Sequence, residues 1–194
     1  FVQTEFLPAL GAVLATRRRA PDEAEMWAAH MVVAEGETIG DLHVETDRAA
    51  FLGRGREPRD AQAMADIERG IAVAQALGSV DVGQCCVVQQ GFVLAVEAVE
   101  GTDAMLSRCG PLARNAPGGV LVKLVKPTQD RRADLPTIGP DTIRGAAAAG
   151  LRGVAFEAGG TILAEREATI EAADAAGLFV LGLDPGTIHQ GRQS

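Results

Sequence analysis

The stretch CCVVQQGFVLAVEA, residues 85–98, holds two apolar runs on either side of Gln89-Gln90-Gly91. This order predicts a β-hairpin, because a short polar turn containing glycine joins antiparallel strands. Both runs are almost continuously apolar instead of alternating, so we expect a sheet that is covered on both faces. The stretch therefore indicates a layered α/β fold, a mixed sheet with a hairpin and covering helices.

Helices and further strands alternate on both sides of this hairpin. From Asp60, apolar side chains recur at spacings of three and four, which predicts an amphipathic helix that ends at Gly78. Downstream we expect a helix from Thr102 or Asp103 to Cys109, a strand over 120–125, a helix from Pro140 to Gly150, strands over 153–159 and 161–165, a helix over 166–177 and a last strand over 178–183. This alternation predicts a sheet that is at least partly parallel in its second half.

The first 58 residues do not follow this order. Asp22 is expected to cap a helix that carries Met26, Trp27 and His30. The charged turn GRGREPRD, residues 53–60, is expected to mark a boundary. We therefore expect a divergent N-terminal segment over 1–58, one domain over 59–183 and a loose tail over 184–194. Position 1 is Phe, not Met, so further residues are expected upstream.

Composition narrows the classes of function. The 194 residues are 47% hydrophobic, which suits one domain with an appendage. The formal net charge of -8 argues against a nucleic-acid partner, which needs a basic face. No apolar run reaches the roughly 20 residues of a membrane-spanning helix, and no signal peptide is evident, so we expect an intracellular protein. The three cysteines have no zinc-site spacing and are expected to be buried, reduced thiols.

Against this acidic background, residues 123–134 carry four cations and two carboxylates. A local positive field in an acidic molecule predicts an anionic ligand. Lys126 follows a predicted strand, at the edge where α/β sheets place ligands. Lys123 lies within that strand, where a lysine usually reaches the sheet edge or pairs with a carboxylate.

Each of two carboxylates near these cations could have either a role in ligand binding or a purely structural role. A helix that begins at Thr102 offers free N–H groups to an anion, but Asp103 would repel a phosphate there unless a divalent cation such as Mg²⁺ or a proton lay between them. Asp103 could instead only stabilise the start of the helix. Asp134, flanked by Arg132 and downstream of Lys126, is expected to stay ionised and to hold a metal or orient a water. An ordinary loop salt bridge would explain it equally well.

Other site classes are weaker. Asp41-Leu42-His43 matches the motif that opens metallophosphoesterases, but the later ligand motifs are missing. Gly53-Arg54-Gly55 lacks the preceding strand and the third glycine of a dinucleotide loop. No histidine lies near the charged stretch, which argues against a serine or cysteine triad.

Five segments together are similar to a known family. They are VDVGQ (80–84), VLAVEAVEGTDAM (93–105), GVLVKLVKPTQDRRADLPTIGPDTI (119–143), AGLRGVAFEAGGTIL (149–163) and AADAAGLFVLG (172–182). The chain from about Pro58 to Gly182 resembles the C-terminal domain of the LpxI-type UDP-2,3-diacylglucosamine pyrophosphatases, and the long K-P-x-Q-D-x-R-x-D-x-P-x-I-G run is specific.

The resemblance implies a Mg²⁺-dependent hydrolase of lipid A biosynthesis that splits UDP-2,3-diacylglucosamine into UMP and 2,3-diacylglucosamine 1-phosphate (lipid X). It also implies a cytoplasmic homodimer that meets its UDP-linked acylated sugar at the inner membrane surface. The family's catalytic aspartate falls on Asp134, and metal-binding carboxylates are expected at Asp103 and Asp130. Substrate-binding residues are expected at Gly101, Thr102, Lys123, Lys126, Gln129 and Arg131.

Two departures from the family leave alternatives open. The family's own N-terminal domain is not found, and residues 21–55 look like added or substituted sequence. Either the chain is an excerpt of a longer protein, or the segment with Trp27 replaces the missing lid. A non-catalytic module that binds a UDP-lipid or another anion is the alternative function. A purely structural charge network inside an oligomer is a third possibility.

Overall fold

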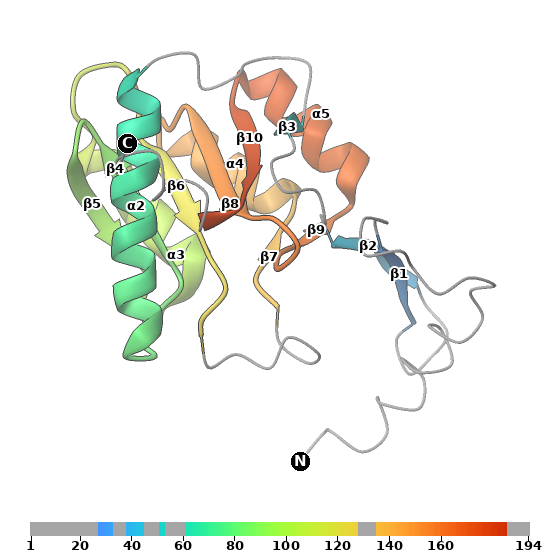
Figure 1. The fold of residues 1–194 in the computed structure, drawn as a ribbon. Coiled ribbons are helices and arrows are strands. Elements are labelled where there is room, and N and C mark those ends of the chain that lie inside the picture. The colour runs from blue at the N-terminus through green and yellow to red at the C-terminus, as the bar shows by residue number, and fades with distance from the viewer. Residues whose placement is uncertain (1–26, 33–37, 45–50, 53–60, 128–134, 186–194) are drawn as a thin grey trace.

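The structure of the chain is a computed structural model, which describes residues 61–127 and 135–185 together with the strands over 27–32, 38–44 and 51–52 (Figure 1). The described residues form a six-stranded and a four-stranded sheet. No helix in this part of the chain is long and apolar enough to span a bilayer. The expected helix cap at Asp22, the boundary at 53–60 and the tail beyond Pro185 lie outside the described residues.

The larger sheet has the strand order β3-β10-β8-β6-β4-β5. Its strands are β3 (Phe51–Leu52), β4 (Cys85–Gln89), β5 (Phe92–Val96), β6 (Val120–Lys123), β8 (Gly153–Glu157) and β10 (Phe179–Leu183). β6, β8 and β10 run parallel, whereas β4 is antiparallel to both β6 and β5. The predicted mixed α/β sheet, its hairpin and its parallel second half are therefore confirmed.

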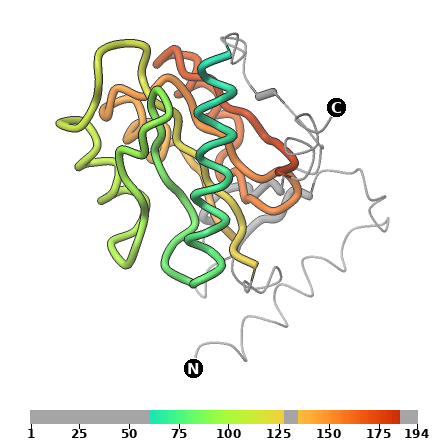
Figure 2. Tube along the Cα trace, turned by 60° about the vertical axis from the view of Figure 1, so that its left-hand side comes forward, coloured from blue at the N-terminus to red at the C-terminus, as the bar shows by residue number. Residues whose placement is uncertain are grey.

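Helices cover both faces of this sheet. α2 (Ala61–Ser79) lies on one face in both views (Figures 1 and 2), and its Ile67 and Ile71 pack with Cys86 and Val88 of β4. α3 (Gly101–Cys109), α4 (Pro140–Ala148) and α5 (Arg166–Ala176) contribute to the other core, which takes Cys85 and Val87 from the same strand. Because successive side chains of β4 enter opposite cores, this strand is apolar throughout.

The edge strand β5 differs from that expectation. Among the strands that the structure describes it pairs with β4 alone, and Phe92 and Val93 at its start are exposed. An apolar run thus does not prove burial on both faces, because a strand at the edge of a sheet has less cover than a central one.

The smaller sheet has the order β1-β2-β9-β7. β1 (Trp27–Val32) pairs antiparallel with β2 (Thr38–Val44), which continues to β9 (Ile162–Ala164), and β9 runs parallel to β7 (Thr137–Ile138). The helix expected to carry Trp27 and His30 was therefore wrong, because both residues lie in β1. Cross-strand pairing with the β-branched segment of β2 outweighs the local helix signal.

Two predicted helix ends also need correction. α2 passes through Gly78 to Ser79, and the residue with positive φ is Asp81 (57°). Gly78 instead allows a close approach, since an added Cβ would lie 3.2 Å from Cδ of Pro127. At α3 the N-cap is Glu100, so neither Thr102 nor Asp103 caps the helix, and the chain continues after Cys109 into a 3-10 turn, η1 (Gly110–Leu112).

The expected start of α4 and the expected end of α5 are confirmed, whereas α4 ends at Ala148 and not at Gly150. Pro140 is the first residue of α4, where its missing N–H costs nothing. Gly177 closes α5 in the left-handed conformation with φ of 68°. The three cysteines are buried and free, as expected, and burial raises the pKa of Cys86 to about 12.

One buried carboxylate ties the hairpin to α2. Asp66, only 1% exposed, accepts hydrogen bonds from the backbone N–H of Gln90 (3.0 Å) and Gly91 (2.7 Å) and from Nε2 of Gln62 (3.0 Å). Gln90 and Gly91 both have positive φ, 54° and 78°, which is the primed turn that suits strand twist. Asp66 thus satisfies two N–H groups that the turn itself leaves unpaired.

We expect Asp66→Ala to lower the free energy of unfolding by about 2–3 kcal/mol, because two backbone donors lose a charged acceptor. Urea unfolding followed by circular dichroism measures this loss. Glu171→Ala removes an exposed carboxylate from α5 and is the control, with an expected change within about 0.5 kcal/mol. Equal stability of the Asp66 and Glu171 variants would contradict this role for Asp66.

Candidate functional site

A cavity of about 420 Å³ opens where α3 and α4 begin, beside strands β6, β7 and β9. The cavity joins the end of β6 in the larger sheet to elements of the smaller sheet. Its lining residues come from α3, α4, β6, β7, β9 and positions next to them: Glu100, Gly101, Thr102, Asp103, Lys123, Thr137, Gly139, Pro140, Asp141, Thr142, Ala164 and Glu165. We call this cavity the α3–α4 cleft.

Two helix N-termini contribute to the α3–α4 cleft. The first residues of α3, Gly101 to Asp103, and those of α4, Pro140 to Thr142, all line it. Neither helix has a hydrogen bond from a capping side chain. Free N–H groups and the positive end of the helix dipole both favour an anion. Gly101 has φ of 81°, which explains why glycine stands at the start of α3.

Lys123 is the cation of the α3–α4 cleft. Its side chain is buried, at 6% exposure, and its ammonium donates to Oγ1 of Thr102 (3.1 Å) and to the carbonyl of Thr137 (2.9 Å). An ammonium has three N–H donors. The third has no partner among the residues that the structure describes, and Lys123 lines the cleft, so one donor is left for a ligand.

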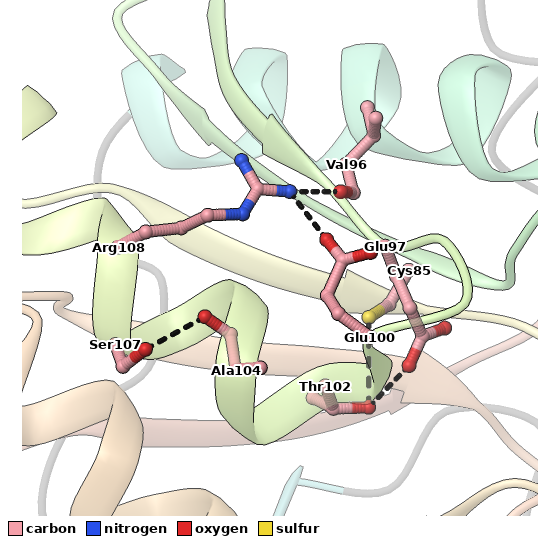
Figure 3. Close-up of polar contacts among 8 residues, drawn as sticks. All are labelled: Cys85, Val96, Glu97, Glu100, Thr102, Ala104, Ser107 and Arg108. Atoms are coloured by element: carbon pink, nitrogen blue, oxygen red, sulfur yellow. Dashed lines mark hydrogen bonds and ion pairs between the residues drawn. The ribbon is translucent and has the colours of Figure 1, made fainter.

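Behind Lys123 lies a buried carboxylate. Glu97, 6% exposed, accepts a hydrogen bond from the Thr102 hydroxyl at 2.6 Å and from the Gln84 N–H at 3.1 Å. Figure 3 shows Glu97 and Thr102 side by side, with Sγ of Cys85 3.8 Å from the Thr102 hydroxyl oxygen. Burial and the charge of Glu97 raise the pKa of the Cys85 thiol well above its usual value, so the thiol stays neutral.

The rim of the α3–α4 cleft carries an ion pair. Nη2 of Arg108 donates to Oε1 of Glu100 at 2.7 Å and to the Val96 carbonyl at 2.6 Å (Figure 3). The hydrogen bond from Arg108 lowers the pKa of Glu100. Glu100 therefore stays ionised at neutral pH and ties the start of α3 to β5.

The predicted site residues fall into three groups. Gly101, Thr102, Asp103 and Lys123 all line the α3–α4 cleft. Lys126 does not line it, and its Nζ instead lies 2.8 Å from Oδ1 of Asp81, in the turn after α2. The remaining four residues fall outside the described part of the chain: Gln129, Asp130, Arg131 and Asp134. Their roles stay predictions.

The structure adds cleft residues that the sequence did not single out. Thr137, Asp141, Thr142 and Glu165 line it, and Asp141 pairs with Arg144 on the outer side of α4. The signal was present at Gly139-Pro140-Asp141, which was read as a helix start but not as an anion site. The free N–H groups at the start of α4 favour an anion for the same reason as those at the start of α3.

The described residues do not form a metal site enclosed by protein ligands. In residues 61–127 and 135–185, no group of three or more histidine, cysteine, aspartate or glutamate side chains is placed to hold a metal ion. Asp103 and Asp141 both line the α3–α4 cleft. Mg²⁺ commonly takes one or two protein carboxylates and completes its shell with phosphate oxygens and waters. The oxygen donors of this cleft therefore fit Mg²⁺ better than a metal that needs a full protein cage.

Comparison with known proteins places these residues in a family context. A family model described as the LpxI C-terminal domain matches residues 52–181. The chain is also 49% identical over 160 residues to the protein named UDP-2,3-diacylglucosamine pyrophosphatase LpxI from Caulobacter vibrioides. That match covers 78% of this chain and 57% of the relative, so the chain spans little more than half of that relative's length. All lining residues of the α3–α4 cleft fall within the family match.

Proposed function

The chain belongs to the LpxI C-terminal domain family, and from that membership we propose that it hydrolyses the pyrophosphate bond of UDP-2,3-diacylglucosamine. The products would be UMP and 2,3-diacylglucosamine 1-phosphate, the lipid X of lipid A biosynthesis. The observation that carries the proposal is the α3–α4 cleft, in which two helix N-termini and the Lys123 ammonium face one space. This arrangement suits a diphosphate, whose two adjacent anionic groups need several donors at once.

In this proposal the described residues bind and orient the diphosphate. Backbone N–H groups at the starts of α3 and α4 would donate hydrogen bonds to phosphate oxygens, and the third N–H of Lys123 would donate to one of them. Thr142, which is 8% exposed, also lines the cleft. Donors that are fixed before the substrate arrives stabilise the charge that develops on phosphorus without reorganisation.

Hydrolysis also requires a positioned water. Water adds to one phosphorus, the bond from that phosphorus to the bridging oxygen breaks, and two phosphate monoesters leave. We assign the orienting carboxylate to Asp134, by resemblance to the family's catalytic aspartate. Gln129 and Arg131, from the same segment, would contact the substrate, and Lys126 before it would do so outside the α3–α4 cleft. The described residues that flank this segment are Pro127, which follows β6, and Leu135, which precedes β7.

Magnesium is part of the same proposal. Of the described residues in the α3–α4 cleft, Glu100, Asp103, Asp141 and Glu165 are carboxylates, whereas Lys123 is the one cation. A diphosphate would be repelled by this lining unless further positive charge were supplied. Bound Mg²⁺ would supply it and polarise the phosphates, with Asp103 as one ligand and Asp130 as a second.

The acylated substrate has consequences for location and assembly. Two acyl chains hold such a lipid at a membrane surface, so we propose peripheral contact with the cytoplasmic face of the inner membrane. We also propose a homodimer, as the family resemblance implies. Sedimentation of the purified chain, alone and with vesicles that contain anionic lipid, tests both proposals.

The direct test is turnover by the chain itself. Incubation with UDP-2,3-diacylglucosamine and Mg²⁺ should release UMP, quantified by chromatography, and EDTA should stop the release. The background is the release in the presence of Asp134→Ala. UMP formation no greater than that background would contradict the proposal. Calorimetric binding of the UDP-lipid without UMP release would instead favour the non-catalytic binding module.

A further inference from the structure

We infer that Glu97, which is not among the lining residues of the α3–α4 cleft, is a positioning residue that acts through Thr102 on Lys123. In this account Glu97 fixes the Thr102 hydroxyl as a hydrogen-bond acceptor, and the hydroxyl then aims the Lys123 ammonium at an anionic ligand. The inference deepens the proposed function, because it rests on the cleft being a diphosphate site. It concerns a residue for which neither the motifs nor the family comparison supplied a role.

The hydroxyl of Thr102 decides the direction of the network. A hydroxyl has one proton to donate and two lone pairs to accept with. The distance of 2.6 Å from Oγ1 of Thr102 to Oε1 of Glu97 is that of a charge-assisted O–H···O⁻ bond. An ionised carboxylate can only accept, so the proton of Thr102 points at Glu97. The lone pairs of the hydroxyl are then left for other donors.

Lys123 is the main donor to that hydroxyl. Its ammonium lies 3.1 Å from Oγ1 of Thr102 and 2.9 Å from the Thr137 carbonyl oxygen. Two bonds at fixed acceptors set the rotation of the ammonium about its last bond, because the three N–H groups have tetrahedral geometry. The third N–H is then directed by the other two. Rotation of the Thr102 proton toward Lys123 would remove one of these bonds and release the ammonium.

The charge of Glu97 has a second effect. Lys123 is 6% exposed and Glu97 also 6% exposed, so two opposite charges share a buried site with a hydroxyl between them. A buried ion is costly unless an opposite charge is close. The main chain holds Glu97 in place, because the Gln84 N–H donates to Oε2 at 3.1 Å and the Glu97 N–H donates to the Cys85 carbonyl at 2.9 Å. Glu97 therefore balances the ammonium from a rigid position without competing for the ligand.

The test is a double-mutant cycle on the binding of inorganic pyrophosphate with Mg²⁺, measured by titration calorimetry. Glu97→Gln keeps the shape of the side chain but removes its charge, and Thr102→Val keeps the shape of threonine but removes the hydroxyl. Each single variant should weaken binding about tenfold, the usual scale for a charged hydrogen bond. The double variant should weaken it by about the same factor as either single one, because both break one relay.

Conservative variants separate this relay from a purely structural role. Thr102→Ser retains the hydroxyl and should bind pyrophosphate within about threefold of the wild type. Glu171→Gln, an exposed carboxylate on α5, should not change binding. Thermal unfolding checks that each variant folds. If Glu97→Gln does not fold, the relay is still tested by comparing the pyrophosphate affinities of Thr102→Ser and Thr102→Val.

Each outcome has a defined meaning. Multiplicative losses in the double variant, or wild-type affinity in Thr102→Val, would overturn the relay and leave the proposed hydrolysis untouched. The relay would also be overturned if the wild type did not bind pyrophosphate at millimolar concentration. Non-additive losses in a chain that releases no UMP would support the relay and contradict only the proposed reaction.

Discussion

Lys123→Met is expected to lower kcat/KM for UDP-2,3-diacylglucosamine by ~10²- to 10³-fold, the scale reported for one donor that stabilises transition-state charge. Methionine fills a similar volume but removes the buried ammonium from the α3–α4 cleft, where it is the one cation among the described lining residues. The loss should appear mainly in kcat if the ammonium acts on the charge that develops during reaction. Steady-state release of UMP measures both constants.

Lys123→Arg is the matched variant for this experiment. It keeps a positive charge, but a planar guanidinium cannot reproduce the bonds to Thr102 and the Thr137 carbonyl with the same geometry. We expect activity between that of the wild type and that of Lys123→Met. A folded Lys123→Met protein with wild-type kcat/KM would exclude Lys123 from the reaction.

Asp134→Ala is expected to reduce kcat by ~10³-fold or more, within the range for loss of a residue that positions or deprotonates water. The substrate should still bind, because the donors of α3, α4 and Lys123 remain. A large fall in kcat with little change in KM is therefore the expected pattern. Single-turnover release of UMP gives the rate of the chemical step.

The control for this variant changes the reach of the carboxylate and not its charge. Asp134→Glu moves the group by one methylene and should retain more activity than Asp134→Ala. If Asp134→Ala keeps more than about one tenth of the wild-type rate, the family's aspartate does not have the assumed role in this chain.

Much of the fold could be predicted because its signals are local. The turn at Gln90-Gly91, the proline that begins α4 and the glycine that ends α5 are each placed by backbone geometry that few residues tolerate. Continuous apolar residues in β4 followed from burial in two cores. These features depend on neighbours in sequence or on a single burial rule, so a sequence reading recovers them.

The errors arose where distant residues decide the structure. The segment with Trp27 has a plausible helix pattern, but it pairs with β2, and β2 pairs with β9 more than 100 residues later in the chain. Similarly, Thr102 has the residue type of a helix cap, yet its hydroxyl donates to Glu97. Gly78 ends no helix, because its role is the close approach to Pro127. Such partners cannot be read from spacing.

The candidate site, like the fold, could be predicted only in part from the sequence. Gly101, Thr102, Asp103 and Lys123 were selected from charge and motif, and they share one cleft. Lys126 carries the same charge three residues after Lys123, but its side chain pairs with Asp81 outside that cleft. No motif singles out Glu97, because its importance depends on lying behind Thr102 and Lys123. Proximity of this kind emerges only when the strands and helices have been assembled.

The central claim is that the diphosphate of the substrate sits in the α3–α4 cleft. A crystal structure of Asp134→Ala with bound UDP-2,3-diacylglucosamine and Mg²⁺ tests it most directly. The account predicts both phosphates beside the first residues of α3 and α4, with one oxygen within hydrogen-bonding distance of Nζ of Lys123. Phosphates bound elsewhere, with Lys123 and Thr102 unchanged and without contact to the ligand, would contradict it.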